Sequence, residues 1–418
     1  MNRSYFLIPL YILITGMPAF GQVTLKECQE KARNNFPLIR QCDLIELSKE
    51  YTLSNAGKAY LPQLDVTLIG GFIEGLPSFS PPGSESSSSN FNAISVIQLN
   101  QMIWDGGITK ARKGIAEASA EIERADLEVA LFALEDRVNN LFFGVLMIDE
   151  QLKQLEILKS TLLRSRRRIE IAIENGTAFK SDIDELDVEV IHTDQRSEEL
   201  STNRSAYVNV LAAMTGEAIE GDAEFIRPEI EDAFLTVENN RPELMLFQNR
   251  ENLINAQSQI DKAMLFPKIG ILGFGTFIQP GADFGTSKLN NIFIGGISLN
   301  WSLGNLYTNS TNKKLSEVNL QKVHVQRETF LFNTNLELTQ TQYDLEKHKK
   351  LIDQDREIVA LKSSIKKAYD VKYENGICTM SELLDRTNEE SVARQQLIVH
   401  EIRYLMKAYQ YLNITGNQ

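Results

Sequence analysis

The sequence has 418 residues, with 56 acidic and 43 basic side chains and a formal net charge of −13. An apolar share of 43% and a charged share of 24% are typical of folded proteins, which excludes a largely disordered chain. The excess of acids excludes a nucleic-acid binder that works by bulk positive charge, and no internal apolar run reaches the length of a membrane-spanning helix.

Residues 1–21 have the pattern of a signal peptide for export. One basic residue, Arg3, precedes an apolar run over residues 5–14, and Ala19-Phe20-Gly21 supplies a cleavage site before Gln22. We therefore expect a mature chain that begins near Gln22 and lies outside the cytoplasm.

The three cysteines leave two alternatives open. Cys28 and Cys42 lie on either side of the bend at Pro37, so in an exported protein they could form a disulfide. Equally, the cysteines could be small buried apolar residues, and Cys378 has no evident partner.

The sequence contains an internal duplication with a period of about 200 residues. Four landmarks recur in the same order, at offsets of 205, 205, 200 and 200 residues: Asn35/Asn240, Pro62/Pro267, Gly176/Gly376 and Gly216/Gly416. We expect a first structural repeat over residues 22–216, a linker over 217–229 and a second structural repeat over 230–418.

In the first repeat, a helical pattern over residues 38–60 ends before Pro62, as helices do before proline. Residues 63–73 and 91–103 are predicted strands on either side of a Ser-rich loop. A very long helix is then predicted over 108–173 because its apolar residues follow an unbroken heptad spacing, typical of a coiled coil of about 100 Å: Leu127, Leu131, Leu134, Val138, Leu141, Val145, Ile148, Leu152 and Leu155. A second helix follows over 181–214.

The second repeat predicts strands over 268–278 and 291–303, and helices over 309–373 and 381–412. Its last strand has the clearest alternation, with Ile297, Leu299, Trp301 and Leu303 on one face and Ser298, Asn300 and Ser302 on the other. The expected fold class is therefore mostly α with β: a long antiparallel coiled coil of helices and four strands per protomer.

Strands of ten to thirteen residues are long enough to cross an outer membrane at a tilt. Four strands cannot close a barrel, and lipid does not tolerate unpaired strand edges, so closure would require other copies of the chain. Three copies would give twelve strands, although edge chemistry alone does not fix that number. The alternative is that the hairpins cap a periplasmic coiled-coil scaffold that forms no pore.

The order and doubling of these features resemble the TolC-like outer-membrane efflux proteins, over essentially the whole mature chain. The residues that carry the resemblance are the two Asn-x-Pro motifs, the motifs that follow a strand (Trp104-Asp105-Gly106-Gly107 and Leu303-Gly304-Asn305) and the glycine turns before Ser181-Asp182 and Ser381-Glu382. The resemblance implies a homotrimer with a 12-stranded transmembrane β-barrel in the outer membrane lipid and an α-helical barrel in the periplasm.

The resemblance further implies partners. Such channels bind a periplasmic adaptor (membrane fusion) protein and an inner-membrane transporter, and together these export small molecules. Export of proteins by a type I secretion system is the alternative, and the sequence does not identify the substrate, the pump or the adaptor.

The resemblance also places a gate at the periplasmic end, in the turns between each long helix and the helix after it. Counted from the turn glycine, Ser181 and Asp182 match gate positions in the first repeat, and Tyr373, Glu382 and Asp385 match them in the second. Cys378 occupies the position of an arginine in the family's pattern, which puts the salt-bridge lock of the gate in doubt. The alternative is that the three acids are simply those that a helix dipole favours at a helix start.

Sequence motifs for catalysis are missing. The four histidines have no metal-binding spacing, and no phosphate-binding loop or nucleophile elbow occurs. We expect no enzyme, no cofactor, no metal site and no nucleic-acid partner.

Overall fold

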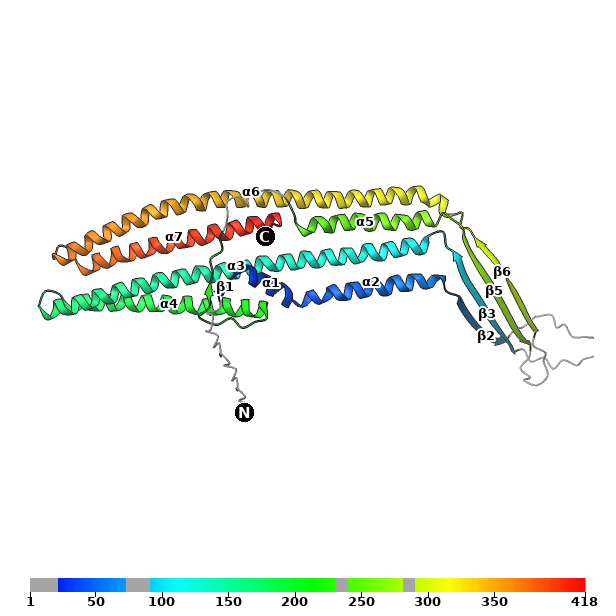
Figure 1. The fold of residues 1–418 in the computed structure, drawn as a ribbon, viewed down its shortest axis with the longest axis horizontal. Helices are drawn as coiled ribbons and strands as arrows, with labels where there is room; N and C mark the ends of the chain where they lie inside the picture. The colour runs from blue at the N-terminus through cyan, green and yellow to red at the C-terminus, as the bar shows by residue number, and fades with distance from the viewer. Residues whose placement is uncertain (1–21, 73–90, 230–238, 281–289, 418) are drawn as a thin grey trace, which may run out of the picture. The chain divides into compact units, whose positions relative to one another are not determined.

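The computed structural model describes residues 22–72, 91–229, 239–280 and 290–417 (Figure 1). Their contacts divide the chain into two compact units. Unit 1 consists of Met1–Ile39, Glu128–Pro242 and Leu331–Gln418, and unit 2 consists of Arg40–Leu127 and Glu243–Phe330. The predicted signal peptide (1–21) and Ser-rich loop (73–90) lie outside the described residues.

Two very long helices contribute residues to both units. Helix α3 runs over Ile108–Glu174 and helix α6 over Asn305–Glu374, so α3 has nearly the predicted bounds and α6 begins four residues earlier than predicted. The heptad seam predicted in α3 is confirmed as a packing face, because its residues are buried or half-buried throughout. The chain is mostly helical with few strands, which confirms the predicted fold class.

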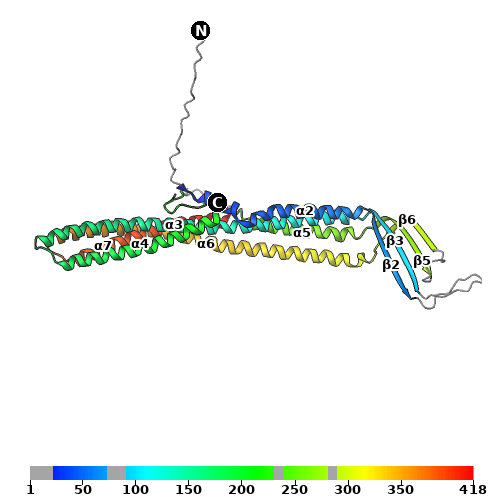
Figure 2. The same cartoon turned by 90° about the horizontal axis from the view of Figure 1, so that it is seen from below.

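Unit 2 contains a four-stranded antiparallel sheet in the order β2-β3-β5-β6 (Figure 2). Its strands are β2 (Gln63–Phe72), β3 (Phe91–Trp104), β5 (Lys268–Pro280) and β6 (Asn290–Asn300). Helix α2 (Gln41–Gly57), with the 3₁₀ turn η2 (Lys58–Tyr60), leads into β2, and helix α5 (Pro242–Ala263) precedes β5.

The prediction for the last strand was wrong at its end. Alternation continues in the sequence to Leu303, but β6 ends at Asn300. The indole of Trp301 instead donates a hydrogen bond to the carbonyl of Leu265 at 3.0 Å, and Asn305 donates to the carbonyl of Met264 at 2.9 Å. These two bonds hold the segment after β6 against the end of α5, away from a strand partner.

Unit 1 packs the rest of the helices around α3. Helix α1 (Leu25–Asn35) and the 3₁₀ turn η1 (Pro37–Arg40) begin the described chain after β1 (Gln22–Val23), which pairs in parallel with β4 (Glu224–Phe225). Helices α4 (Lys180–Thr215) and α7 (Met380–Thr415) follow the two long helices. The largest core cluster of unit 1 centres on Phe142, which is fully buried between Phe143 and Phe225.

Two pairs of landmarks from the sequence meet in unit 1. Asn35 donates hydrogen bonds to the carbonyls of Ala213 (3.3 Å) and Met214 (3.1 Å), just before the left-handed cap Gly216. In the second half, the backbone N–H of Asn240, and not its side chain, donates to the carbonyl of Thr415 at 2.8 Å, just before the left-handed cap Gly416. Each Asn-x-Pro motif therefore closes the C-terminus of a helix that lies about 180 residues away in the sequence.

A buried polar cluster lies between α6 and α7. The Nδ1 atom of His400 is 2.5 Å from Oδ2 of Asp355, Gln396 contacts the other ring nitrogen at 3.0 Å, and the ring of His348 lies 5.6 Å from that of His400. His348 and Asp355 occupy positions in a buried heptad of α6: Leu338, Thr341, Leu345, His348, Ile352 and Asp355. Polar side chains at such core positions fix the register of a coiled coil.

All three cysteines are free thiols, so the described structure has no disulfide between Cys28 and Cys42. Cys28 is buried in the core of unit 1, as one of the two alternatives predicted. None of the helices in the described residues combines the length and the apolar composition needed to cross a membrane.

Candidate functional site: the helical turns and the sheet

The turns after the two long helices have the same backbone geometry. Gly176 and Gly376 both adopt left-handed conformations, with φ of 70° and 67°. In the first turn Thr177 donates to the carbonyl of Ala172 at 2.8 Å, and in the second Ile377 donates to that of Lys372 at 2.9 Å. These bonds, together with those of the glycine amides, form Schellman caps. Both turns therefore reverse the chain at a fixed geometry.

Two of the predicted gate acids cap the helices that follow. In α7, Thr379 and Glu382 form a reciprocal capping box: Glu382 accepts from the Thr379 amide at 2.8 Å and donates its own amide to the Thr379 hydroxyl at 3.2 Å. In α4, Asp182 accepts from the Phe179 amide at 3.1 Å, but a phenylalanine side chain has no acceptor to return the bond. The hydrogen bonds from Thr379 lower the pKa of Glu382. Both acids are thus helix caps in this structure.

Tyr373, near the end of α6, lies within the electrostatic influence of Asp182 in the first turn of α4. Its ring packs against a core cluster of unit 1 that includes Leu186 of α4 and Met380 of α7. Burial raises the pKa of the Tyr373 phenol, and the nearby carboxylate of Asp182 raises it further. The predicted gate residues of the two halves, Asp182 and Tyr373, are therefore brought close together.

The position of Cys378 is held without an arginine. Its thiol lies 3.6 Å from the carbonyl of Tyr369, and burial raises its pKa. The aromatic ring of Tyr369 has two cations over it, Lys372 at 4.5 Å and Arg386 at 5.5 Å. The Lys372 contact lies within α6, whereas the Arg386 contact joins α7 to α6 by a cation–π interaction at the position where the resemblance implied a salt bridge.

An ion pair that the sequence did not predict links the ends of the long helices. Arg168, about two helical turns before the end of α3, lies 3.3 Å from Glu374, the last residue of α6. Both side chains are exposed, so this pair adds little to stability, at most about 1 kcal/mol. Because this ion pair joins α3 to α6 near the two glycine turns, it would have to break if one turn moved away from the other.

The remaining predicted gate residues are exposed. Ser181 lies on the first turn of α4 and Asp385 on the second turn of α7, and among the described residues no hydrogen bond or ion pair involves either side chain. Asp385 lines a groove of about 600 Å³ between α6 and α7, together with Asp355 and Glu389. The turns also expose two apolar side chains, Phe179 at 78% and Ile377 at 72%. In the sequence, the one signal for Phe179 and Ile377 is that each is a large apolar residue in a mostly polar turn.

The Trp-Asp-Gly-Gly motif forms the junction between sheet and helix. Asp105 is buried, and its carboxylate accepts hydrogen bonds from the Tyr60 hydroxyl (2.8 Å) and from the amides of Gly107 (2.9 Å) and Thr109 (2.6 Å). Burial alone would raise the pKa of Asp105, but the hydrogen bonds together outweigh it and the pKa is lowered. Gly106 (φ 75°) is required because a Cβ there would lie 2.8 Å from the carbonyl oxygen of Ala263.

The register of the sheet separates its side chains into two faces. Directly paired residues share a face, so pairs such as Leu64–Leu99, Val66–Ile97 and Ile271–Ile297 define face A. Pairs such as Asp65–Gln98, Gln63–Asn100 and Lys268–Asn300 define face B. Face A has no charged residue, whereas both charged residues of the four strands, Asp65 and Lys268, lie on face B.

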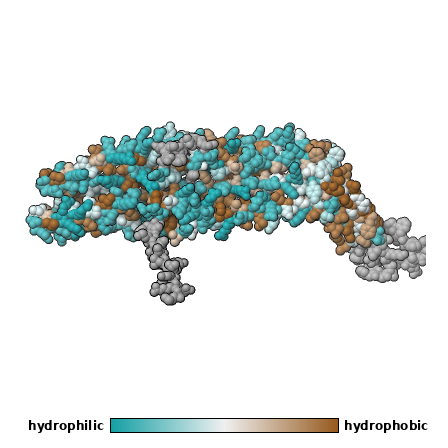
Figure 3. Space-filling view, viewed as in Figure 1, coloured by the Kyte–Doolittle hydropathy of each residue, from teal (hydrophilic) through white to brown (hydrophobic). Residues whose placement is uncertain are grey.

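Apolar side chains on the sheet are exposed to an unusual degree. Leu68 on face A is 77% exposed and Ile297 is 82% exposed. Figure 3 shows hydrophobic residues gathered over the strands, while the helical part is mostly hydrophilic on the same view. The outer edges of β2 and β6 have no strand partner within the described residues. A sheet of this kind needs an apolar surrounding on face A and a neighbour at each edge.

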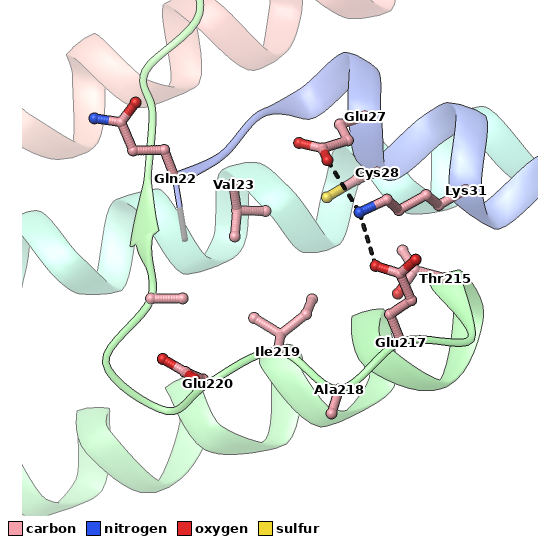
Figure 4. A pocket seen from close by; sticks show the side chains of 11 residues that line it. Gln22, Val23, Glu27, Cys28, Lys31, Thr215, Glu217, Ala218, Ile219 and Glu220 are labelled. Carbon is pink, nitrogen blue, oxygen red and sulfur yellow. Dashed lines mark ion pairs between the residues drawn. The ribbon is translucent and has the colours of Figure 1, made fainter. Parts of the chain in front are cut away.

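A cavity of about 280 Å³ in unit 1 lies beside β1, α1 and the turn after α4 (Figure 4). Lys31 points into it and forms ion pairs with Glu27 (3.0 Å) and Glu217 (2.7 Å), which raise its pKa. Burial raises the pKa of the Cys28 thiol to about 12. A neutral thiol and a fully paired cation make this cavity a poor site for nucleophilic chemistry.

The structure is similar to solved outer-membrane channels. It matches VceC of Vibrio cholerae (14% identity, TM-score 0.68, 94% of this chain and 96% of that one) and the CmeC channel of Campylobacter jejuni (12%, 0.64, 94% and 85%). It also matches the open state of the MtrE channel of Neisseria gonorrhoeae (15%, 0.65, 94% and 89%). No model of a known protein family and no curated protein matches the sequence. The chain therefore has the fold of the TolC-like outer-membrane channels, which confirms the predicted resemblance at the level of fold.

Proposed function

We propose that this chain forms, with other copies of itself, the outer-membrane duct of an export system. The observation that carries the proposal is the four-stranded sheet, which has two unpaired edges, an uncharged apolar face A and both of its charges on face B. In outer-membrane barrels, apolar residues face lipid and polar residues face the lumen. Face A would then contact lipid and face B would line the pore.

The strand directions allow copies to close a ring. Each pair of neighbours in the sheet is antiparallel, so β2 and β6 run in opposite directions. The β6 strand of one copy can therefore pair with β2 of the next in the same antiparallel sense. Three copies would give twelve strands and a barrel about 24 Å across between backbones.

Helix α6 offers a second surface for a neighbouring copy. On the face opposite its buried heptad it carries exposed apolar residues at heptad spacing: Leu315, Val318, Val325, Phe332, Leu336 and Tyr343. A coiled-coil seam is stable only when a partner helix covers it. A homotrimer would supply that partner, and the helices would then form the tunnel in the periplasm.

In this proposal the protein is a passive exit path and not an enzyme. The fold shared with VceC, CmeC and MtrE supports a location in the outer membrane with a periplasmic helical portion. A periplasmic adaptor and an inner-membrane transporter would supply recognition and energy for the export of small molecules.

A matched pair of lysine substitutions in β2 tests the assignment of the two faces. Leu68→Lys would place a charge on the lipid face near the middle of the strand, at a cost of about 2–4 kcal/mol, whereas Thr67→Lys would place it in the lumen. We expect wild type and Thr67→Lys to migrate as heat-modifiable, SDS-resistant trimers extracted only by detergent, and Leu68→Lys to lose most of that species. A water-soluble monomer obtained without detergent would instead support a scaffold without a pore.

We further propose that the two glycine turns form the gate. Asp182 near Tyr373 and the free carboxylate of Asp385 support this assignment, because acids that converge on a narrow pore attract cations. Asp385→Asn removes a charge without disturbing a helix cap, and Glu382→Gln keeps the capping box while it removes a second charge. We expect both variants to lower cation selectivity in planar-bilayer recordings. Unchanged selectivity in the double variant would remove these acids from the pore.

A further inference from the structure

Face B of the sheet has two chemically different zones. Next to the helices it is mostly polar, with Met102 and Leu272 among seven polar residues: Gln63, Asp65, Gln98, Asn100, Lys268, Ser298 and Asn300. Farther along the strands it becomes mostly apolar, with Thr67 and Thr276 among six apolar residues from all four strands: Ile69, Ile94, Val96, Phe274, Ile292 and Ile294. We call these six apolar residues the inner apolar band. Three of its members are exposed, Ile69 at 57%, Ile292 at 53% and Ile294 at 61%, and the other three are half-buried.

The register establishes that the band is continuous. Ile94 is paired with Ile69, and Phe274 with Ile294. Val96 and Ile292 both share a row with Thr276 of the strand between them. The band therefore runs diagonally from β2 to β6: it passes from Val96 to Phe274, which lies two residues along β5 from Thr276, the direct partner of Val96. It lies on the opposite side from the apolar residues of face A.

An apolar band on this face departs from the usual chemistry of a water-filled barrel, whose interior is polar. If face B lines the lumen, these side chains stay in contact with water in the assembled channel, which is unfavourable by about 25 cal/mol for each Å² of apolar surface. Apolar surface that remains open inside a pore is characteristic of a binding site for apolar groups.

One charge adjoins the band. Asp65 lies in the same row as Gln98, Phe274 and Ile294, at the boundary between the polar zone and the band. Asp65 is exposed, and within the described residues no cation is paired with it. The one base of the sheet, Lys268, is six positions from Phe274 along β5, about 20 Å away along the strand. The local charge is thus negative beside an apolar surface.

We propose that the inner apolar band and Asp65 form a lumenal binding site for amphiphilic organic cations, with the cationic head at Asp65 and the apolar part on the band. This inference rests on the proposed duct, because it requires face B to line the pore. With side chains extending about 5 Å from the wall, three copies would leave an opening about 14 Å wide, so a small cation could bind there and still move along the pore.

Current block by alkyltrimethylammonium ions tests the site. The probes are the butyl, hexyl and octyl members, which share one head group and differ only in apolar length. In wild-type channels in planar bilayers, we expect the half-blocking concentration to fall by up to about fourfold for each added methylene group. Phe274→Ser with Ile294→Ser should flatten this dependence on chain length. Asp65→Asn should instead weaken the block by a similar factor for all three probes.

Ile297→Ser is the matched control, because Ile297 lies on the same strand as Ile294 but on face A. We expect this variant to keep the wild-type block. A conducting wild-type channel whose block does not depend on chain length would overturn the inference and leave the duct intact. Wild-type protein that forms no channel at all would overturn the proposed duct and the inference with it.

Discussion

The left-handed glycines allow a quantitative test of how the C-terminus of the chain is held. Gly416 ends α7 with φ of 72°, and a Cβ built on it would lie 2.6 Å from the carbonyl carbon of Asn240. Gly376 has nearly the same conformation, with φ of 67°, but no atom lies within 4 Å of its Cβ position. Alanine would therefore add the same backbone strain at both positions. It would add a steric overlap at residue 416 alone.

The structure gives the magnitudes. A left-handed conformation costs an L-residue about 1–2 kcal/mol, so Gly376→Ala should lower the free energy of unfolding by that amount. Gly416→Ala should lower it by about 2–5 kcal/mol, because an overlap with backbone adds about 1–3 kcal/mol. Gly216→Ala should fall between them, since its Cβ would meet the side chain of Asn35, which can move away at the loss of its two hydrogen bonds.

Chemical unfolding of the detergent-solubilised protein, followed by far-ultraviolet circular dichroism, measures these differences. The expected order of unfolding midpoints is wild type, Gly376→Ala, Gly216→Ala and Gly416→Ala, from most to least stable. If Gly416→Ala were no less stable than Gly376→Ala, Asn240 would not pack against the end of α7 as the structure describes.

Three further outcomes follow from buried groups. Burial lowers the pKa of His348 from its usual 6.5, so below that pH the folded protein binds fewer protons than the unfolded chain. Stability should therefore fall as the pH drops below 6.5, which the unfolding midpoints at about pH 7.5 and about pH 5 measure. His348→Gln should reduce the difference between these two midpoints. An unchanged difference would contradict the burial of His348. Phe142→Ala should destabilise unit 1 by about 3–5 kcal/mol in the same unfolding assay, and a loss under 1 kcal/mol would argue against a packed core at this residue. Cys28 should react with iodoacetamide far more slowly than Cys42 at about pH 8, because its thiol stays protonated, and equal alkylation by mass spectrometry would contradict the structure.

Much of the helical architecture could be predicted because strong local signals marked it. The heptad seam of α3 specified both the helix and its buried face, and the turn glycines Gly176 and Gly376 indicated where α3 and α6 end. The sequence did not show that the Asn-x-Pro motifs contact the caps at Gly216 and Gly416, because nothing local connects residues so far apart. The duplication itself stays a prediction, although the second half repeats the long helices, the hairpins and both caps.

The sheet was harder to predict than the helices. Only β6 alternates clearly, so the sequence could not assign faces to β2, β3 and β5, and the alternation beyond Asn300 was misleading. Pairing supplies the missing information, because residues opposite each other in the register share a face. Asp65 and Lys268, which appear unrelated in the sequence, are on one face for this reason.

For the predicted gate residues, the sequence indicated positions but not hydrogen-bond partners. Position relative to the turn glycine predicted both Asp182 and Glu382, but not what their carboxylates bond to. Glu382 has Thr379 as a reciprocal partner, while Asp182 faces Phe179, which offers no acceptor. The two halves therefore differ in how firmly the acid is held, and Asp182 is the acid whose charge raises the pKa of Tyr373.

The same heptad spacing has two different outcomes in the two long helices. In α3 the seam that includes Leu131, Val138 and Val145 is buried inside the protomer. In α6 one seam is buried, with polar residues at His348 and Asp355, and a second seam from Leu315 to Tyr343 is exposed. A buried polar residue fixes register, whereas an exposed apolar seam gains stability only from another helix. In the proposed duct, a neighbouring copy would therefore cover the face of α6 opposite α7. Within the described residues the edges of β2 and β6 are also unpaired, and they would pair with neighbouring copies in the same way.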